Sequence, residues 1–181
     1  LALHLRAARR EANDFPQAVL LSAPTGAGKT VIATALIETL MEPDVLTSLL
    51  PTVLWLTDQP ELNEQTRRKM LAHSTVLDAS SLVTIEQTFV ERQLAPGTVY
   101  FLNTQKLAKT SGLVTKRDAR PWTLWDVIRD AIEQRPHDFI VIVDEAHRGM
   151  AETDKDREQA QSIVQRFIKG GEDIPAAPII V

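Results

Sequence analysis

Cysteine is missing from this 181-residue sequence, and aromatic residues make up only 5% of it. The lack of cysteine excludes disulfide scaffolds, thiol catalysis and zinc sites built on sulfur. The histidines show neither H-x3-H nor HExxH spacing, which argues against a zinc hydrolase; they are His4, His73, His137 and His147. No apolar run approaches the roughly 20 residues that span a bilayer, so we expect no integral membrane segment.

The overall composition is that of a globular domain. Apolar residues make up 44% and charged residues 24% of the chain, which excludes disordered and fibrous classes. A net charge of -4 argues against a general polyanion binder, although it leaves room for a local basic face. The length predicts one domain, and Leu1 in place of Met suggests a piece of a longer protein. We expect no signal peptide, because the charges near the N-terminus follow the apolar residues.

Short apolar runs alternate with helical periodicity along the chain. The runs typical of strands are residues 18–22, 53–57, 82–85, 98–103, 139–143 and a last one from 178. Helical spacing marks residues 1–12, 30–41, 60–73, 122–134 and 156–169. Apolar strands that alternate with amphipathic helices predict an α/β domain with a mainly parallel sheet.

A phosphate-binding loop is indicated by residues 23–30, which read APTGAGKT between an apolar run and a helical segment. Gly26 and Gly28 permit positive φ angles and a close approach of the backbone to a ligand. The loop amides and the helix N-terminus would present a positive field to an anion. Lys29 would contact the β- and γ-phosphates, and the Thr30 hydroxyl would bind Mg2+. Ala23 stands where this pattern usually begins with glycine.

The most apolar run, FIVIV at 139–143, leads directly into Asp144-Glu145-Ala146-His147. An apolar strand that ends in carboxylates places them where open α/β sheets bind ligands. Asp144 would hold Mg2+, and Glu145 would orient and deprotonate the attacking water. Adjacent carboxylates repel each other, so such a pair is expected to have a cation close by.

Together the two motifs resemble motifs I and II of the DEAD/DEAH-box superfamily-two helicases and translocases. DEAHRGM at 144–150 is most similar to the restriction subunit of type III restriction enzymes. TVLWLTDQPELNEQ at 52–65 resembles motif Ia, and VYFLNTQKLAK at 99–109 resembles a later motif of the first lobe that contacts nucleic acid. The resemblance covers nearly the whole chain and implies a three-layer RecA-like P-loop NTPase fold, with the sheet truncated at its C-terminal end.

The resemblance also implies roles for individual residues. Those implied to bind the phosphates of ATP are Pro24, Thr25, Gly26, Ala27, Gly28, Lys29 and Thr30. Thr30 and Asp144 would hold Mg2+, Glu145 would act with Lys29 and Asp144 in hydrolysis, and His147 would couple the ATP site to the nucleic acid. The implied contacts to a DNA backbone are Thr57, Gln59, Thr104, Gln105 and Lys106. Such contacts carry no sequence information.

By this resemblance, residues 1–181 form the N-terminal ATP-binding lobe of a cytoplasmic, prokaryotic DNA helicase or translocase of the restriction or phage-defence type. Its partners would be DNA, a second RecA-like lobe with an arginine finger, and nuclease or methyltransferase subunits. Loss of such a finger lowers rates by about 10³–10⁵ in related enzymes, so we expect poor hydrolysis by these residues alone. The alternatives are a nucleotide-gated nucleic-acid-binding module without turnover and an RNA helicase lobe.

Two further features are left open by the sequence. Residues 106–120 hold five basic residues and one acid, which fits either a solvated loop or a nucleic-acid path. Arg148 would either bind another lobe or cap the strand end. Trp122 and Trp125 share helical spacing with Ile128 and Ile132, which favours core packing over base stacking.

Overall fold

A computed structural model describes residues 4–7, 16–24, 26–42, 50–118, 120–144 and 154–181, with only the backbone described over 154–161. Residues 4–7 are helical. The strands are β1 (Gln17–Ala18), β2 (Thr52–Thr57), β3 (Leu82–Thr84), β4 (Val99–Asn103), β5 (Phe139–Val143) and β6 (Ile179–Ile180). The helices are α2 (Lys29–Met41), α3 (Pro60–His73), α4 (Leu124–Gln134) and α5 (Asp154–Lys169), with 3-10 turns η1 (Thr104–Leu107), η2 (Gly112–Val114) and η3 (Pro136–Asp138).

The strands form one parallel sheet in the order β1-β6-β5-β2-β4-β3. In its centre, Trp55 of β2 lies opposite Phe101 of β4 and Ile142 of β5. Parallel neighbours need crossover connections. The helices α2, α3, α4 and α5 each lie in one of them, whereas residues 85–98 join β3 to β4 without a helix. Because all carboxyl ends of the strands meet at one edge, the loops that follow the strands gather there.

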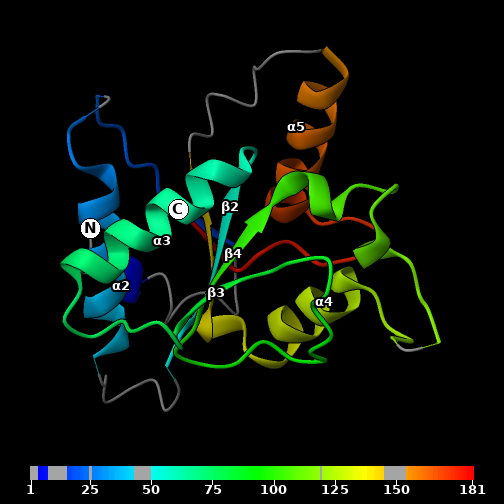
Figure 1. The fold of residues 1–181 in the computed structure, drawn as a ribbon, viewed down its shortest axis with the longest axis horizontal. Helices are drawn as coiled ribbons and strands as arrows, with labels where there is room; N and C mark the ends of the chain where they lie inside the picture. Colours follow the sequence, from blue (N-terminus) through cyan, green and yellow to red (C-terminus); the bar gives the residue numbers. More distant parts are fainter. Residues whose placement is uncertain (1–3, 8–15, 25, 43–49, 119, 145–153) are drawn as a thin grey trace.

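Helices cover both faces of the sheet, so the chain folds in three layers (Figure 1). Alternate residues of β2 point to opposite faces. Leu54 and Leu56 join a buried cluster with α4 and α5, whereas Val53 and Trp55 join one with α2 and α3. This α/β architecture with an all-parallel sheet confirms the predicted fold class.

Local sequence accounts for where the helices begin. Pro60 occupies the first turn of α3, where its missing N–H is not needed. Thr123 caps α4, because its hydroxyl accepts a hydrogen bond from the Asp126 amide (3.1 Å) and the Asp126 carboxylate accepts one from the Thr123 amide (2.8 Å). Within α4, Trp125 is 5% exposed, and Trp122 just before the helix packs against the same core, as their spacing predicted.

The strand expected over residues 18–22 was wrong in its extent. β1 covers only Gln17–Ala18, and the Leu20 side chain is 89% exposed. Gln17 and Ala18 pair with Ile179 and Ile180, and the amide of Val19 donates to the Ile180 carbonyl (2.8 Å). The apolar run is therefore longer than the strand, because apolarity alone does not define how far backbone pairing extends.

None of the helices in the described ranges is both long enough and apolar enough to cross a membrane.

Candidate functional site

The loop after β1 has the backbone geometry of an anion-binding turn. Gly26 and Gly28 have φ angles of +84° and +78°. A Cβ atom at Gly26 would meet nothing within 4 Å, so the backbone conformation and not a lack of space requires glycine there. The loop is closed by a hydrogen bond from the Ala27 amide to the Pro24 carbonyl (3.1 Å).

This turn directly precedes the N-terminus of α2. Gly28 is the N-cap and provides no capping side chain, and no acidic residue lies in the first turn. The first amides of a helix have no intrahelical acceptor, and the helix dipole places partial positive charge beside them. The N-terminus of α2 is therefore suited to a phosphate group.

A cavity of about 640 Å³ brings the two predicted motifs together. Ala23 and Pro24 of the loop, Lys29 and Thr30 of α2, and Asp144 after β5 all line it. In the sheet only β6 separates β1 from β5, so the phosphate loop and Asp144 follow strands close together at the same edge. The Asp144 amide donates to the Leu56 carbonyl (2.9 Å), which ties the residue to the end of β2.

Apart from Ser22, the rest of the cavity wall is apolar, and the sequence motifs did not reveal it. Trp55 and Ile142 line the cavity from the sheet, and Val164 and Ile168 line it from α5. The Trp55 indole N–H is buried and has no hydrogen-bond partner among the described residues. The only sequence signals for these residues were the apolar runs that contain Trp55 and Ile142 and the helical spacing around Val164 and Ile168, and both are equally typical of ordinary core.

The oxygen donors in the cavity fit a magnesium ion. Mg2+ keeps several water ligands and binds through one or two protein oxygens together with substrate phosphates. Thr30 and Asp144 both line the cavity, and their hydroxyl and carboxylate are oxygen groups of this kind. The described part of the chain contains no group of three or more acidic or histidine side chains that would form an all-protein metal cage.

Three predicted site residues, Thr25, Glu145 and His147, lie outside the described residues, as does Arg148. Their roles stay predictions from the sequence.

The predicted nucleic-acid residues of β2 lie at the carboxyl edge of the sheet. Thr57 is buried, and its hydroxyl accepts a hydrogen bond from the Gln59 amide (3.1 Å). Gln59 is half-buried and is the N-cap of α3. The Thr57 side chain thus shapes the turn into α3, and the Gln59 side chain is the more accessible of the two.

The corresponding residues after β4 lie beside them. Thr104 is buried, and its hydroxyl has no partner among the described residues, whereas Gln105 is exposed. The Lys106 ammonium donates to the Ile85 carbonyl (2.5 Å) and to the Glu86 carboxylate (2.7 Å). The positive charge of Lys106 is therefore already paired in this structure.

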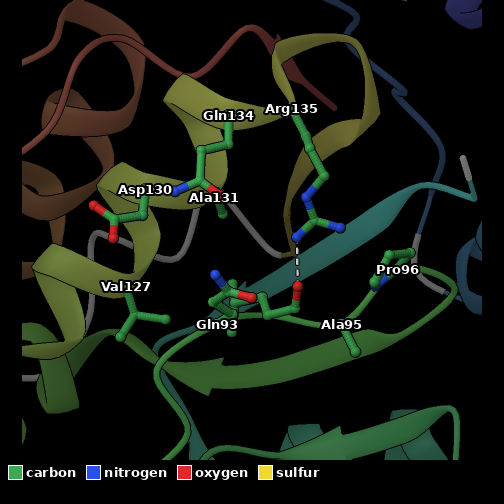
Figure 2. Close-up of a pocket in the computed structure, with 9 residues that line it drawn as sticks. Gln93, Ala95, Pro96, Val127, Asp130, Ala131, Gln134 and Arg135 are labelled. Atoms are coloured by element: carbon green, nitrogen blue, oxygen red, sulfur yellow. Dashed lines mark hydrogen bonds between the residues drawn. The ribbon is translucent and has the colours of Figure 1, made fainter.

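A second cavity, of about 510 Å³, lies near residues that precede strands β4 and β5 and not at the carboxyl ends of the strands (Figure 2). Residues 93–96, which precede β4, form one wall, and Val127 to Arg135 of α4 and its C-cap form the other. Arg135 closes one end by donating to the Leu94 carbonyl. None of the predicted site residues lines this cavity.

Carboxylates with a lowered pKa stabilise the scaffold and do not line the 640 Å³ cavity. The Ser74 hydroxyl, and then the Thr75 amide, lower the pKa of Glu38 on α2. The Ser80 hydroxyl does most to lower the pKa of Asp78. Burial raises the pKa of Asp126, but the hydrogen bonds of its capping box and of Arg129 outweigh that effect.

Comparison with known families agrees with this geometry. Residues 4–170 match the model of the family described as type III restriction enzyme, res subunit. The chain belongs to this family. The match confirms the resemblance to the N-terminal lobe of superfamily-two helicases. Type III res subunits are helicase-like ATPases, which in general use a nucleotide with Mg2+ and act on nucleic acid with a second lobe. No curated protein matches the chain.

Proposed function

We propose that the chain binds ATP with Mg2+ in the 640 Å³ cavity and forms the N-terminal motor lobe of a DNA helicase or translocase of the restriction type. The observation that carries this proposal is that Asp144 lines the same cavity as Lys29 and Thr30, although it is distant from both in the sequence. A lysine, a hydroxyl and a carboxylate beside a helix N-terminus are the groups that phosphoryl transfer requires.

Each side chain has a proposed task in this site. Residues 25–30 hold the phosphates through backbone amides, and Lys29 compensates their negative charge. Pro24 has no N–H to donate, so it contributes to the wall of the cavity instead. Thr30 and Asp144 provide oxygen ligands for Mg2+, which when bound neutralises charge that develops on the phosphate oxygens. Glu145 positions and deprotonates water, and His147 links the nucleotide to the nucleic-acid side. Thr57, Gln59, Thr104, Gln105 and Lys106 are the proposed backbone contacts. Because Lys106 is paired with Glu86, its contact with phosphate requires an exchange of partners.

Nucleotide binding is testable with the chain itself. Trp55 lines the cavity whereas Trp122 and Trp125 do not, so we expect ATP with Mg2+ to change the Trp55 fluorescence. Lys29→Ala removes a charge-assisted contact and should weaken binding about 10- to 100-fold. Lys69→Ala is the matched control, since Lys69 is exposed on α3 and outside the cavity. Equal affinity of both variants, or no binding by the unaltered chain at millimolar ATP, would refute the site.

Turnover is tested in the whole protein with its second lobe. We expect Glu145→Gln to abolish DNA-stimulated ATP hydrolysis. A low baseline rate that neither DNA nor Glu145→Gln changes would favour a module that binds nucleotide without turnover. Stimulation by duplex DNA compared with single-stranded RNA decides between a DNA and an RNA motor. The 181 residues alone should hydrolyse ATP slowly, because an arginine finger from a second lobe contributes about 10³–10⁵ in rate.

A further inference from the structure

Residues 109–120, here named the basic arm, carry a concentration of unpaired positive charge. Lys109, Lys116, Arg117 and Arg120 share this segment with one acid, Asp118, although the chain as a whole has a net charge of -4. Most other described arginines form an ion pair with a carboxylate: Arg6, Arg67, Arg68, Arg92, Arg129 and Arg166. No cation of the basic arm has a carboxylate partner among the described residues.

The basic arm is held in a defined shape. Arg120 is only 7% exposed, and its guanidinium donates to the carbonyls of Phe89 (3.4 Å), Thr115 (3.3 Å) and Gly112. The backbones of Arg117 and Arg120 exchange two hydrogen bonds, of 2.8 and 2.9 Å. A buried cation is costly unless its donors are satisfied, and here backbone carbonyls satisfy them without neutralising the charge.

Three of the four cations remain available to a partner. Lys109, Lys116 and Arg117 are exposed, whereas Arg120 is buried. Arg117 lies close enough to Arg120 to help lower the pKa of Arg120, after burial as the main cause. Like charges held together without counterions create a positive potential that an anion would relieve.

The basic arm lies next to the residues that we propose to contact the nucleic-acid backbone, at the carboxyl edge of the sheet. It follows η1, which contains Thr104 to Lys106, and it is anchored on Phe89, which follows β3 at the same edge. In the sheet order, β4 and β3 lie at the end opposite to β1 and the phosphate loop. The segment extends outward from the body of the lobe at the right of Figure 1.

We propose that the basic arm is an additional contact for the phosphate backbone of nucleic acid, beyond the contacts expected from the helicase motifs. The inference rests on the proposed function, since it assumes that the lobe acts on nucleic acid. Contacts of this kind are independent of base sequence and release counterions. Each phosphate neutralised on duplex DNA changes the slope of log K against log salt by about 0.9, so three exposed cations account for about 2.7.

The test compares two triple variants of equal charge. Lys109→Gln, Lys116→Gln and Arg117→Gln remove the three exposed charges of the basic arm. The control is Arg68→Gln, Lys69→Gln and Lys169→Gln, three exposed cations on α3 and α5. Fluorescence anisotropy with labelled duplex DNA, over a series of salt concentrations, gives the affinity and the salt slope of each. A parallel series with single-stranded RNA shows which nucleic acid the arm contacts.

We expect the arm variant to bind duplex DNA at least about tenfold more weakly at low salt, with a salt slope smaller by about 2 to 3. The control variant should have a DNA affinity and a salt slope much closer to those of the unaltered chain. ATP binding, followed through Trp55, should be unchanged in both variants, which shows that the fold and the nucleotide site are intact.

The outcomes separate this inference from the proposed function. If the unaltered chain binds DNA and the two variants have the same affinity and slope, the role of the basic arm is refuted while the motor lobe stands. That result would instead point to an acidic protein surface as the partner of the arm. If the unaltered chain binds neither DNA nor RNA at low salt, both the arm proposal and the nucleic-acid part of the proposed function fail.

Discussion

Glu38 connects the phosphate-loop helix to the end of its neighbour, and its removal should loosen that connection. One oxygen of the Glu38 carboxylate on α2 accepts hydrogen bonds from the Ser74 hydroxyl (2.6 Å), the Thr75 amide (2.9 Å) and the Val76 amide (3.3 Å). These donors follow directly after α3. We predict that Glu38→Gln, which keeps a neutral oxygen of similar shape, lowers the free energy of unfolding.

The size of the effect follows from the kind of bond that is lost. Hydrogen bonds to a charged acceptor contribute about 1.5–3 kcal/mol where water is excluded, and neutral ones about half as much. Glu38 is only half-buried, so water competes for its oxygens. This competition reduces the difference in stability between a charged and a neutral acceptor at this position. We therefore expect a loss of about 1 kcal/mol for Glu38→Gln at pH 7, and about 2 kcal/mol for Glu38→Ala, which removes the acceptor altogether.

This loss should depend on pH in a defined direction. The Ser74 hydroxyl and the Thr75 amide hold the pKa of Glu38 below its ordinary value of 4.5, against the opposing effect of burial. A lowered folded-state pKa stabilises the protein above the unfolded pKa, and this stabilisation disappears as the pH falls through the folded-state pKa. The unaltered chain and Glu38→Gln should therefore differ fully above about pH 5 and converge at lower pH.

Urea unfolding at several pH values between 3 and 7 measures this difference. Glu133→Gln is the matched control, because Glu133 is an exposed glutamate on α4 for which the structure shows no hydrogen bond or ion pair among the described residues. The reasoning is refuted if Glu38→Gln is as stable as Glu133→Gln at pH 7, or if its loss of stability is the same at pH 3 and pH 7.

Three further predictions concern the scaffold and the phosphate loop. Thr123→Ala removes the N-cap of α4 and should cost about 1 kcal/mol in urea unfolding; no loss would show that the cap is dispensable. Phe167→Ala removes a fully buried ring beside Trp125 and should cost about 3–5 kcal/mol, seen as a lower urea midpoint, whereas a loss below 1 kcal/mol would contradict its core position. Gly28→Ala places a Cβ at a φ of +78° and should cost about 1–2 kcal/mol and weaken ATP binding in calorimetry; unchanged stability would show that the turn relaxes.

Elements whose signals are local were predictable from the sequence, and β1 was not. The strand over 139–143 and the helix over 60–73 have the predicted bounds, because a short run of β-branched and aromatic residues defines the first and Pro60 begins the second. β1 depends instead on pairing with β6, which is distant in the sequence and lies beside it through Gln17 with Ile179 and Ala18 with Ile180. A sequence pattern contains no information about the register of a distant partner.

In the site, too, residues with a local sequence signal were predictable, whereas residues placed by tertiary packing were not. The glycine pattern of the loop and the carboxylate at the end of an apolar run indicated Lys29, Thr30 and Asp144 as one group, and they line one cavity. The apolar wall from Trp55 and α5 was missed, since residues that line a cavity have the same sequence pattern as residues in a core. The pairing of Lys106 with Glu86 was also unpredictable, because it depends on how the turns after β3 and β4 meet.

Hydrogen bonds connect neighbouring strand ends in the described part of the carboxyl edge. These bonds limit how far this edge could deform in a motor. The Asp144 amide is bonded to the Leu56 carbonyl at the end of β2, and the Asn103 side-chain amide at the end of β4 is bonded to the Asp58 carbonyl (2.8 Å). The ends of β5, β2 and β4 are thus tied together across the space between the proposed nucleotide site and the basic arm. A packed, hydrogen-bonded sheet edge deforms little. In the proposed motor we therefore expect any stepping motion to arise between this lobe and a second lobe rather than within the sheet.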